Sequence, residues 1–429
     1  MDINQVKDMP VFGDVDVLVC GSGPAGIGAA LGAARGGAKT MILEMNGCLG
    51  GVATSGMMSN WGGCSSSKIL LEIFARSRNM DLGYTWIDEN NAGSSAIPHD
   101  LVMILLEEMM DEAGAKILYH TFATDAVMDG EKIVGVVVQN KSGRGFIKAK
   151  CVVDSTGDGD VAASAGVPYF KGRETDGKMQ PCTIMFKIGG VDYSRAVFPR
   201  SFETLVDTEK GELQALAKEL LPFPAGHVLL YQQPGPGTVC VNMTNAIGID
   251  GTNAESLTEG IKTCRSQIMP IIRFLREYVP GYEKCWLMGS ASLMGVRETR
   301  HFEGVESLQP DDILEARYFE NWVVRRAFFN FDVHNMSGAS IDKTGVQKNW
   351  TQRRTYTIPY GCLLPKKVEG LLLSGRNISG SHLAHSNFRI MSVCMALGEA
   401  AGVAAALAVK EGISLKDVDV KEIQAVVGE

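Results

Sequence analysis

The sequence predicts an α/β fold in which a parallel sheet and a β-meander form one domain and an inserted α+β segment forms a second. Three observations predict it. A glycine-rich turn near the N-terminus joins an apolar run to a small-residue helix, short alternating strands follow at 115–154, and the strand–helix rhythm returns only after residue 355. At 429 residues the chain is too long for one simple core.

The first unit is a βαβ motif with a dinucleotide fingerprint. An apolar run at 15–19 leads into the turn at 21–26, and a second run at 40–43 ends on Glu44. Gly21 permits a tight turn, Gly23 lets the backbone approach a pyrophosphate, and Gly26 lets the helix pack on the strand. The helix N-terminus attracts phosphate, and the Glu44 carboxylate can accept ribose hydroxyls. The alternative, an ordinary glycine-rich turn, leaves Glu44 at this spacing unexplained.

Helices and a meander follow this unit. Apolar periodicity predicts helices over 68–78 and 99–112. Turn residues then separate short strand patterns, which predicts a β-meander with a return strand. The predicted strands are 115–119, 125–128, 133–139, 145–147 and 151–154.

The pattern of strands and helices after residue 166 predicts an inserted segment and then a return of the chain to the first domain. Residues 167–354 lose the βαβ rhythm and mix strand runs at 183–188 and 238–241 with a long helix at 254–277. An extended stretch at 356–364, a buried strand at 370–374 and a helix at 390–409 restore it. We therefore expect a discontinuous domain of 1–166 and 355–429 and a substrate or cap domain of 167–354. Glu399 interrupts the last helix, which favours a buried helix over a membrane span.

Composition excludes several classes of protein. The net charge is −8, and no cluster of Lys and Arg is interleaved with aromatic residues, so we expect no nucleic-acid partner. The N-terminus does not resemble a signal peptide, so we expect a cytoplasmic protein without a membrane partner. None of the ten cysteines has metal-ligand spacing with histidine, so we expect no metal site.

Four motifs together resemble a known family. They are the turn at 21–26, the loop LGGVATSG at 49–56, the loop DSTGDGD at 154–160 and GRNIS at 375–379. With GVRETR at 295–300 and IPYGCL at 358–363, the chain resembles FAD-dependent oxidoreductases with the glutathione-reductase-like, Rossmann-like FAD-binding fold. That group is distantly similar to fumarate reductases and ketosteroid dehydrogenases.

The resemblance implies FAD as cofactor and little thiol chemistry, because Cys48 lacks the second cysteine of the disulfide reductases. The fingerprint and the resemblance together imply FAD contacts at Gly21, Ser22, Gly23, Pro24, Ala25, Gly26, Glu44, Met45, Gly50, Gly51, Ala53, Thr54, Ala123, Thr156, Gly157, Asp160, Gly375 and Arg376. For Asp160, helix capping is an equal alternative.

Six residues are candidates for substrate chemistry. His382 and His385 lie in a predicted loop after the strand that should end at the flavin, where an imidazole suits proton transfer; loop hydrogen bonding is the alternative. Arg297 and Arg300 resemble arginine pairs that clamp carboxylates, and Arg389 is a third anchor; a structural ion pair is the alternative.

His334 alternates with Asp332 on a predicted strand, so the two side chains share a face and the carboxylate could fix the imidazole tautomer; a surface pair is the alternative.

The sequence thus predicts an FAD-dependent oxidoreductase of the dehydrogenase or reductase type. It would transfer a hydride between flavin and a small polar organic substrate and use a separate electron donor or acceptor. Two alternatives remain: an oxidase or monooxygenase that uses oxygen, and a flavin electron carrier without turnover. Homo-oligomerisation is compatible with the sequence.

Overall fold

The parallel part of the main sheet is built from both ends of the chain. The computed structural model describes residues 1–80, 95–339 and 351–428. Strands β1 (Val11–Cys20), β2 (Thr40–Leu43), β3 (Lys116–Leu118) and β6 (Gly143–Asp154) lie in the order β3-β2-β1-β6 and run parallel. The late strand β17 (Leu371–Leu373) pairs in parallel with the carboxyl half of β6. The predicted return of the chain to the first sheet is confirmed.

The meander occupies the other half of β6. Strands β4 (Phe122–Asp129) and β5 (Lys132–Asn140) are antiparallel, and β5 pairs with residues 143–148 of β6. The prediction of separate strands at 145–147 and 151–154 is wrong, because β6 is continuous. It stays continuous because β1 pairs with it from Phe146 to Asp154, while β5 and β17 share its opposite edge.

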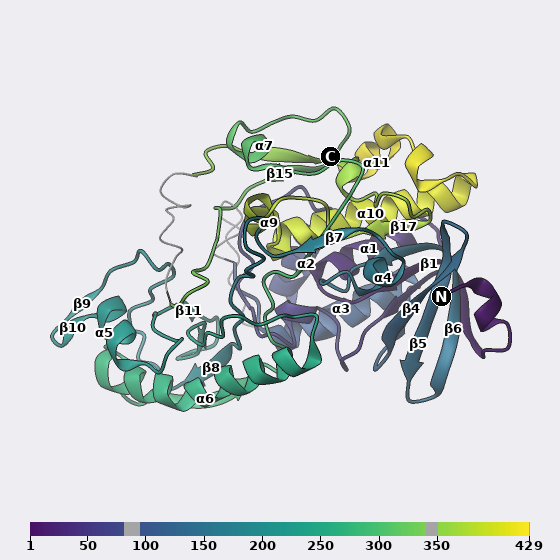
Figure 1. Cartoon of the computed structure of the whole chain (residues 1–429). Helices are drawn as coiled ribbons and strands as arrows, with labels where there is room; N and C mark the ends of the chain where they lie inside the picture. The colour runs from purple at the N-terminus through teal and green to yellow at the C-terminus, as the bar shows by residue number, and fades with distance from the viewer. Residues whose placement is uncertain (81–94, 340–350, 429) are drawn as a thin grey trace.

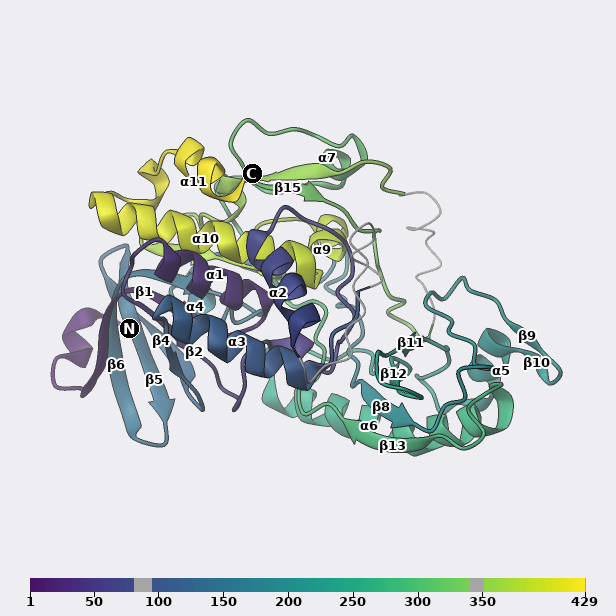
Figure 2. The same cartoon turned by 180° about the vertical axis from the view of Figure 1, so that it is seen from behind.

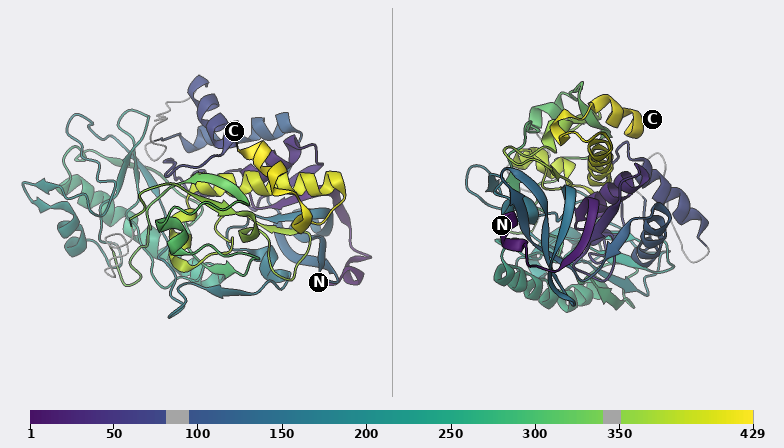
Figure 3. Two further views of the ribbon diagram at one scale, coloured as in Figure 1. Left: turned by 90° about the horizontal axis from the view of Figure 1, so that it is seen from above. Right: turned by 90° about the vertical axis from the view of Figure 1, so that its right-hand side faces the viewer.

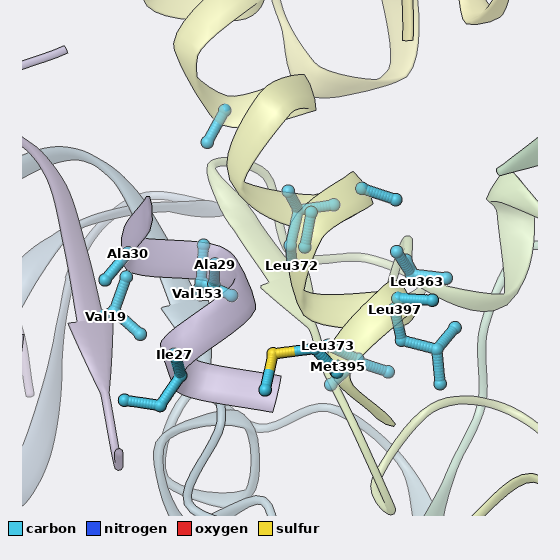
Figure 4. Packing of buried hydrophobic residues seen from close by; sticks show 14 of the residues in the cluster. Val19, Ile27, Ala29, Ala30, Val153, Leu363, Leu372, Leu373, Met395 and Leu397 are labelled. Carbon is cyan, nitrogen blue, oxygen red and sulfur yellow. The ribbon is translucent and has the colours of Figure 1, made fainter. Parts of the chain in front are cut away.

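Two helices pack closely against each other, and Figure 4 shows buried side chains from both, among them Ile27, Ala29 and Leu397. Helix α1 (Pro24–Arg35) crosses α10 (Met391–Glu411) at small residues. A Cβ at Gly28 would lie 2.3 Å from the Met395 carbonyl oxygen, and a Cβ at Gly398 would lie 1.8 Å from the Ala25 carbonyl oxygen. Larger residues at the crossing would force the helices apart.

Helix α10 is a buried core helix, as the sequence predicts. Among the described helices, it is the one long and apolar enough to cross a membrane by length and composition, and 89% of its apolar window is buried inside the protein. Its charged residue Glu399 is also buried and accepts a hydrogen bond from the Ser67 hydroxyl at 2.7 Å. Burial raises the pKa of Glu399.

The other helices of this part cover the sheet and its edges. Helices α2 (Lys68–Asn79) and α3 (His99–Ala113) match the predicted helices and lie beside α1 (Figure 2). Short helices α4 (Asp160–Ser164) and α9 (His382–Phe388) follow β6 and β17, and α11 (Val420–Val427) closes the chain.

A second sheet lies at the end of the molecule opposite the meander (Figures 1 and 2). Strands β8 (Phe186–Gly189), β11 (Leu230–Gln232), β12 (Val239–Val241) and β13 (Trp286–Ser290) form an antiparallel sheet in the order β11-β12-β8-β13. It shares a separate hydrophobic core with α5 (Leu213–Leu220) and α6 (Ala254–Tyr278). The pair β9 (Asp207–Thr208) and β10 (Gly211–Glu212) lies beside α5.

The connecting region packs mostly with the first sheet. Strand β7 (Tyr169–Lys171) pairs with β14 (Arg300–Phe302), and β15 (Trp322–Ala327) pairs with β16 (Tyr356–Pro359). Helix α7 (Pro310–Leu314) lies between β14 and β15 in sequence. The green segment that carries β15 lies beside the yellow C-terminal helices (Figure 3). Buried side chains from Phe302 to Val333 join the larger core. The predicted domain division at 166 and 354 stays a prediction, although these residues pack with the first domain.

Candidate functional site

Four parallel strands end in register at one edge of the main sheet. Cys20 of β1 is opposite both Leu43 of β2 and Asp154 of β6, and Leu373 of β17 is opposite Asp154. Loops that leave the carboxyl ends of parallel strands converge, and ligands of α/β proteins bind there. All the motifs that carry the predicted cofactor contacts belong to this edge, except Ala123.

The turn after β1 leaves one face of its backbone open. Gly21 has φ +91°, and a Cβ there would lie 2.5 Å from the Ser155 carbonyl oxygen. A Cβ at Gly26 would lie 1.9 Å from the Gly21 oxygen. At Gly23, by contrast, a Cβ would meet nothing within 4 Å, and this residue is the N-cap of α1 without a side-chain cap, with Pro24 next. The open backbone above a helix N-terminus fits a pyrophosphate.

The loop at 49–54 lies directly against this turn. The Gly50 N–H donates to the Ser22 carbonyl oxygen at 2.8 Å, and a Cβ at Gly51 would lie 2.8 Å from the Gly23 Cα. Ala53 and Thr54 are buried behind these glycines. Two predicted stretches of the cofactor site are thus adjacent in space.

The Glu44 carboxylate lies beside the same turn. It accepts hydrogen bonds from the backbone N–H and side chain of Ser22, at 3.1 and 2.5 Å, and from those of Asn46, at 2.8 and 2.7 Å. These donors fill the carboxylate's four acceptor positions. A ribose hydroxyl would therefore replace the Ser22 hydroxyl or the Asn46 amide.

Met45 and Ala123 lie in the two segments next to Glu44, Met45 in the bend after β2 and Ala123 near the start of β4. Met45 follows Glu44 directly and is 45% exposed. The Thr121 N–H donates to the Glu44 carbonyl oxygen at 3.0 Å, and half-buried Ala123 follows at the start of β4. Both remain predicted contacts of FAD.

Asp154 organises the loop after β6, a role that the sequence patterns do not reveal. Its carboxylate accepts hydrogen bonds from the Thr156 N–H and hydroxyl, at 3.1 and 2.7 Å, and from the Ala162 N–H at 2.7 Å. Burial raises the pKa of Asp154 to about 6, against the opposing effect of these hydrogen bonds. The N-cap of α4 is Gly159, so the expected alternative, Asp160 as N-cap, is wrong; Asp160 lies in the first turn.

Arginine side chains join this loop to β17 and β14. Arg376 follows Gly375, donates to Asp158 at 3.1 Å and lies over Gly157, where a Cβ would meet its Nη2 at 2.6 Å. Gly375 itself approaches Ala25 of the first turn, with 2.8 Å from its added Cβ to the Ala25 Cβ. The strand end of β17 therefore lies beside the turn after β1, and contact of Gly375 and Arg376 with FAD stays a prediction.

Arg297 and Arg300 do not form a pair. Arg300 Nη1 donates to the Asp160 carboxylate and to the Asp158 carbonyl oxygen, both at 2.8 Å. Arg297 donates instead to the Pro181 carbonyl oxygen and the Thr183 hydroxyl. The prediction of one clamp made by both is wrong, because the intervening Glu298 and Thr299 direct the side chains to different surroundings. For Arg300, the structural ion pair is the better interpretation.

His382 and His385 lie on a helix, α9, rather than in the predicted loop. Ser381 makes the helix possible because its hydroxyl accepts the Ala384 N–H at the N-cap. His382 Nδ1 lies 2.6 Å from Glu298 Oε1, and His301 Nε2 lies 2.8 Å from the same oxygen. The two predicted catalytic segments, 297–300 and 381–389, therefore meet.

Glu298 is the buried centre of this group, and the sequence analysis missed its role. Its side chain is fully enclosed, and Oε2 accepts the Gln180 N–H at 3.0 Å. Burial alone would raise the pKa of Glu298, but the hydrogen bonds from His301 and His382 hold it well below its usual value. The closeness of Glu298 and His301 in sequence was a weak signal, because residues 296–299 form no helix that would place the two side chains on one face.

His385 completes the cluster without a hydrogen bond to its Nδ1. Its ring lies edge-on to His301, with centroids 4.8 Å apart, and its buried Nδ1 has no partner in the structure. Burial lowers the pKa of His385 well below its usual value. Glu298, His301 and His385 bring ligand atoms within 4.8 Å of one another, so they could hold a cation. Glu298 and His301, two of these three residues, are already joined by a hydrogen bond, which explains their closeness without a cation.

Arg389, Asp332 and His334 form a second polar cluster. Arg389 Nη2 donates to the carboxylate and carbonyl oxygens of Asp332, both at 2.8 Å, and His334 Nε2 lies 3.3 Å from the carboxylate. Residues 331–333 are not a strand, so that prediction is wrong, yet the predicted pairing of Asp332 with His334 occurs. Arg297 lies near the charges of both Arg389 and Asp332. Burial and the positive charge of Arg389 lower the pKa of Arg297 to about 10, against the opposing effect of Asp332.

Acid should destabilise this cluster. Burial lowers the pKa of His334 to about 4 and that of nearby His227 to about 3, from 6.5. As pH falls from 6.5 to 4, these histidines become protonated in the unfolded chain but stay neutral in the folded protein. The free energy of unfolding therefore falls by about 1.4 kcal/mol per pH unit for each histidine. Thermal melting at pH 7.0, 5.5 and 4.5 should show a smaller decline for His334→Gln than for the wild type. An equal decline would contradict this assignment.

Comparisons with known proteins agree with the geometry of the cofactor edge. A family model described as FAD dependent oxidoreductase matches residues 16–427. Thiamine thiazole synthase from Methanococcus maripaludis is 34% identical over 155 residues, which cover 34% of this chain and 56% of that protein. The Aeropyrum pernix protein of the same name is 30% identical over 154 residues, 33% of this chain and 54% of the relative. The chain thus spans about half the length of these curated relatives.

A solved structure extends the likeness to the whole fold. p-Nitrophenol 4-monooxygenase PnpA from Pseudomonas putida DLL-E4 superposes with a TM-score of 0.51, covering 97% of this chain and 84% of that one. Sequence identity is 11%, so the likeness concerns the fold alone.

Proposed function

The chain belongs to the FAD-dependent oxidoreductase family and uses FAD as its cofactor, and from this premise we propose that it exchanges a hydride between FAD and a small organic anion. The turn at 21–26, Glu44, the loop at 49–54 and the ends of β6 and β17 would hold the cofactor. When bound, the flavin supplies the hydride acceptor or donor. The protein's own residues bind the anion and move the proton.

The excess positive charge beside the histidine cluster is the observation that carries the proposal. Arg297 and Arg389 share the surroundings of one carboxylate, Asp332. Among the described residues, no carboxylate lies within ion-pair distance of Arg297, and the buried Nε of Arg389 has no hydrogen-bond partner. Arg297 is half-buried, and a partly desolvated guanidinium without its own counter-ion is unfavourable; a substrate carboxylate would supply one.

His382 is our candidate for the proton step. It is 2% exposed, its Nδ1 is fixed by Glu298, and its Nε2 has no hydrogen-bond partner among the described residues. In the oxidative direction, His382 would take a proton from the substrate's O–H or N–H as the hydride leaves the adjacent carbon. His385, whose pKa is strongly lowered, would stay neutral and shape the pocket.

The thiazole synthase relatives do not identify the substrate, because the match covers about a third of this chain. Use of oxygen stays an alternative that the experiment below distinguishes. The cytoplasmic location, the absence of nucleic-acid and membrane partners, and homo-oligomerisation also stay predictions.

A substrate panel tests the proposal. Anaerobic bleaching of the flavin by hydroxy acids and amino acids, but not by their esters or amides, is the expected result. Bleaching by uncharged alcohols alone would contradict an anionic substrate. Bleaching that needs a nicotinamide donor, followed by oxygen-dependent hydroxylation of an added compound, would identify a monooxygenase instead.

Arg297→Ala should weaken binding of the bleaching substrate by about 10–100-fold, because a charge-assisted hydrogen bond contributes about 1.5–3 kcal/mol. The limiting rate of flavin reduction should change little. Stopped-flow traces at several substrate concentrations separate the two quantities. The control is Arg195→Ala, which removes an exposed arginine paired with Glu283. Unchanged affinity in Arg297→Ala would exclude Arg297 as the anchor.

A further inference from the structure

One carboxylate fixes two imidazoles that come from distant parts of the chain. Glu298 Oε1 faces His301 Nε2 at 2.8 Å and His382 Nδ1 at 2.6 Å. Its other oxygen, Oε2, accepts the Gln180 N–H. All three side chains are at most 2% exposed, so water does not compete with these hydrogen bonds.

This arrangement determines which nitrogen of each ring carries a proton. An ionised carboxylate only accepts hydrogen bonds, so His382 must carry its hydrogen on Nδ1 and His301 must carry one on Nε2. In neutral His382 the lone pair is then on Nε2, the atom without a partner among the described residues. The opposite tautomer would place two lone pairs 2.6 Å apart in a buried site.

We infer that Glu298 is a positioning residue, which holds His382 as the Nδ1–H tautomer so that Nε2 accepts the substrate's proton. This inference rests on the proposed function for its chemistry. The step is balanced: the hydride leaves the substrate carbon for FAD, the adjacent O–H or N–H proton goes to Nε2, and a C=O or C=N bond forms. Glu298 touches neither substrate nor cofactor and acts through His382.

Glu298→Gln keeps the shape of the side chain but disturbs this arrangement. If the amide oxygen faces the two imidazoles, the NH₂ group points at the Gln180 N–H, and donor meets donor. If the amide is reversed, its NH₂ group faces both rings and favours the wrong tautomer of His382. In both orientations the amide is neutral, so the variant lacks the negative charge that stabilises the protonated His382 ring.

A double-mutant cycle tests whether Glu298 acts through His382. In the wild-type background, Glu298→Gln should slow anaerobic flavin reduction by about 100-fold or more, with substrate binding nearly unchanged. In the His382→Ala background, the same change should alter the rate by less than about threefold. Equal losses in both backgrounds would overturn the inference and indicate a merely structural role.

Glu174 provides a matched control. It is exposed, and among the residues that the structure describes its carboxylate accepts a hydrogen bond from the backbone N–H of His382 alone, at 2.9 Å. Glu174→Gln should therefore reduce the flavin at a rate near that of the wild type. A loss as large as that of Glu298→Gln would mean that any carboxylate near α9 suffices, and would overturn the special role of Glu298.

A spectroscopic measurement reports the tautomer of His382 directly in the wild-type protein. NMR of the holoenzyme with ¹⁵N-labelled histidine should show His382 as the Nδ1–H tautomer, with assignment from the His382→Gln spectrum. An Nε2–H tautomer would overturn the inference. If His382→Ala reduces flavin as fast as the wild type while the Nδ1–H tautomer is observed, the proposed proton step fails and the positioning by Glu298 stands.

Discussion

Gly23→Val should yield a folded, colourless protein. Gly23 is the N-cap of α1, with φ −62° and ψ 179°, a conformation that any residue adopts. Among the described glycines whose Cβ would meet nothing within 4 Å, it is the one without a positive φ. A valine there should therefore be tolerated by the fold and occupy the space above the helix N-terminus, where the pyrophosphate must approach.

The expected loss of FAD affinity is at least about 100-fold, because the side chain removes both the phosphate's hydrogen bonds to the backbone and its contact with the helix dipole. Absorbance near 450 nm and FAD titration measure this loss, and far-UV circular dichroism measures the fold. Gly23→Ala should show a smaller loss. Ala254→Val, at the exposed first position of α6, is the control for valine at a helix start. A yellow Gly23→Val protein would remove this turn from the cofactor site.

His382→Ala should slow flavin reduction by about 10²–10⁴-fold while FAD stays bound, because the variant lacks the proton acceptor that the reaction needs. The imidazole is buried and fixed by Glu298 at 2.6 Å, so its loss also leaves a cavity of ring size. Single-turnover bleaching under anaerobic conditions measures the rate, and substrate titration should show nearly unchanged binding.

Added imidazole offers a direct control for this second result. It should enter the cavity left by His382→Ala and restore part of the rate in a concentration-dependent manner. N-methylimidazole, which has no N–H to donate to Glu298, should restore less. A wild-type rate in His382→Ala would exclude the proton step, and an absence of FAD would show that His382 is needed for cofactor binding instead.

Local sequence patterns predicted the first βαβ unit well because its parts are local. The tight turn at Gly21, the N-terminus of α1 and the acid after β2 all lie within 24 residues. The predicted helices 68–78, 99–112 and 254–277 were also recognisable, because their apolar stripes repeat with the helix period.

Patterns failed where the partner was distant or the segment short. Seven residues of α9 are too few to show a period, so His382 and His385 were assigned to a loop. The continuity of β6 depends on β1, more than 120 residues earlier. Neighbouring positions in the sequence also misled: Arg297 and Arg300 are close in sequence, but their partners, Thr183 and Asp160, lie in different segments.

The sequence by itself determined the α/β class and the dinucleotide turn, because these depend on residue type and spacing within one βαβ unit. It also determined the FAD family, through several short motifs along the chain, each of which is recognisable from its own residues. Only the tertiary structure decided which ionisable groups act together. It brought Glu298 to His382 across 84 residues and Arg389 to Asp332 across 57. Such pairings arise from the packing of separate segments around a common core, and no periodicity within either segment encodes them.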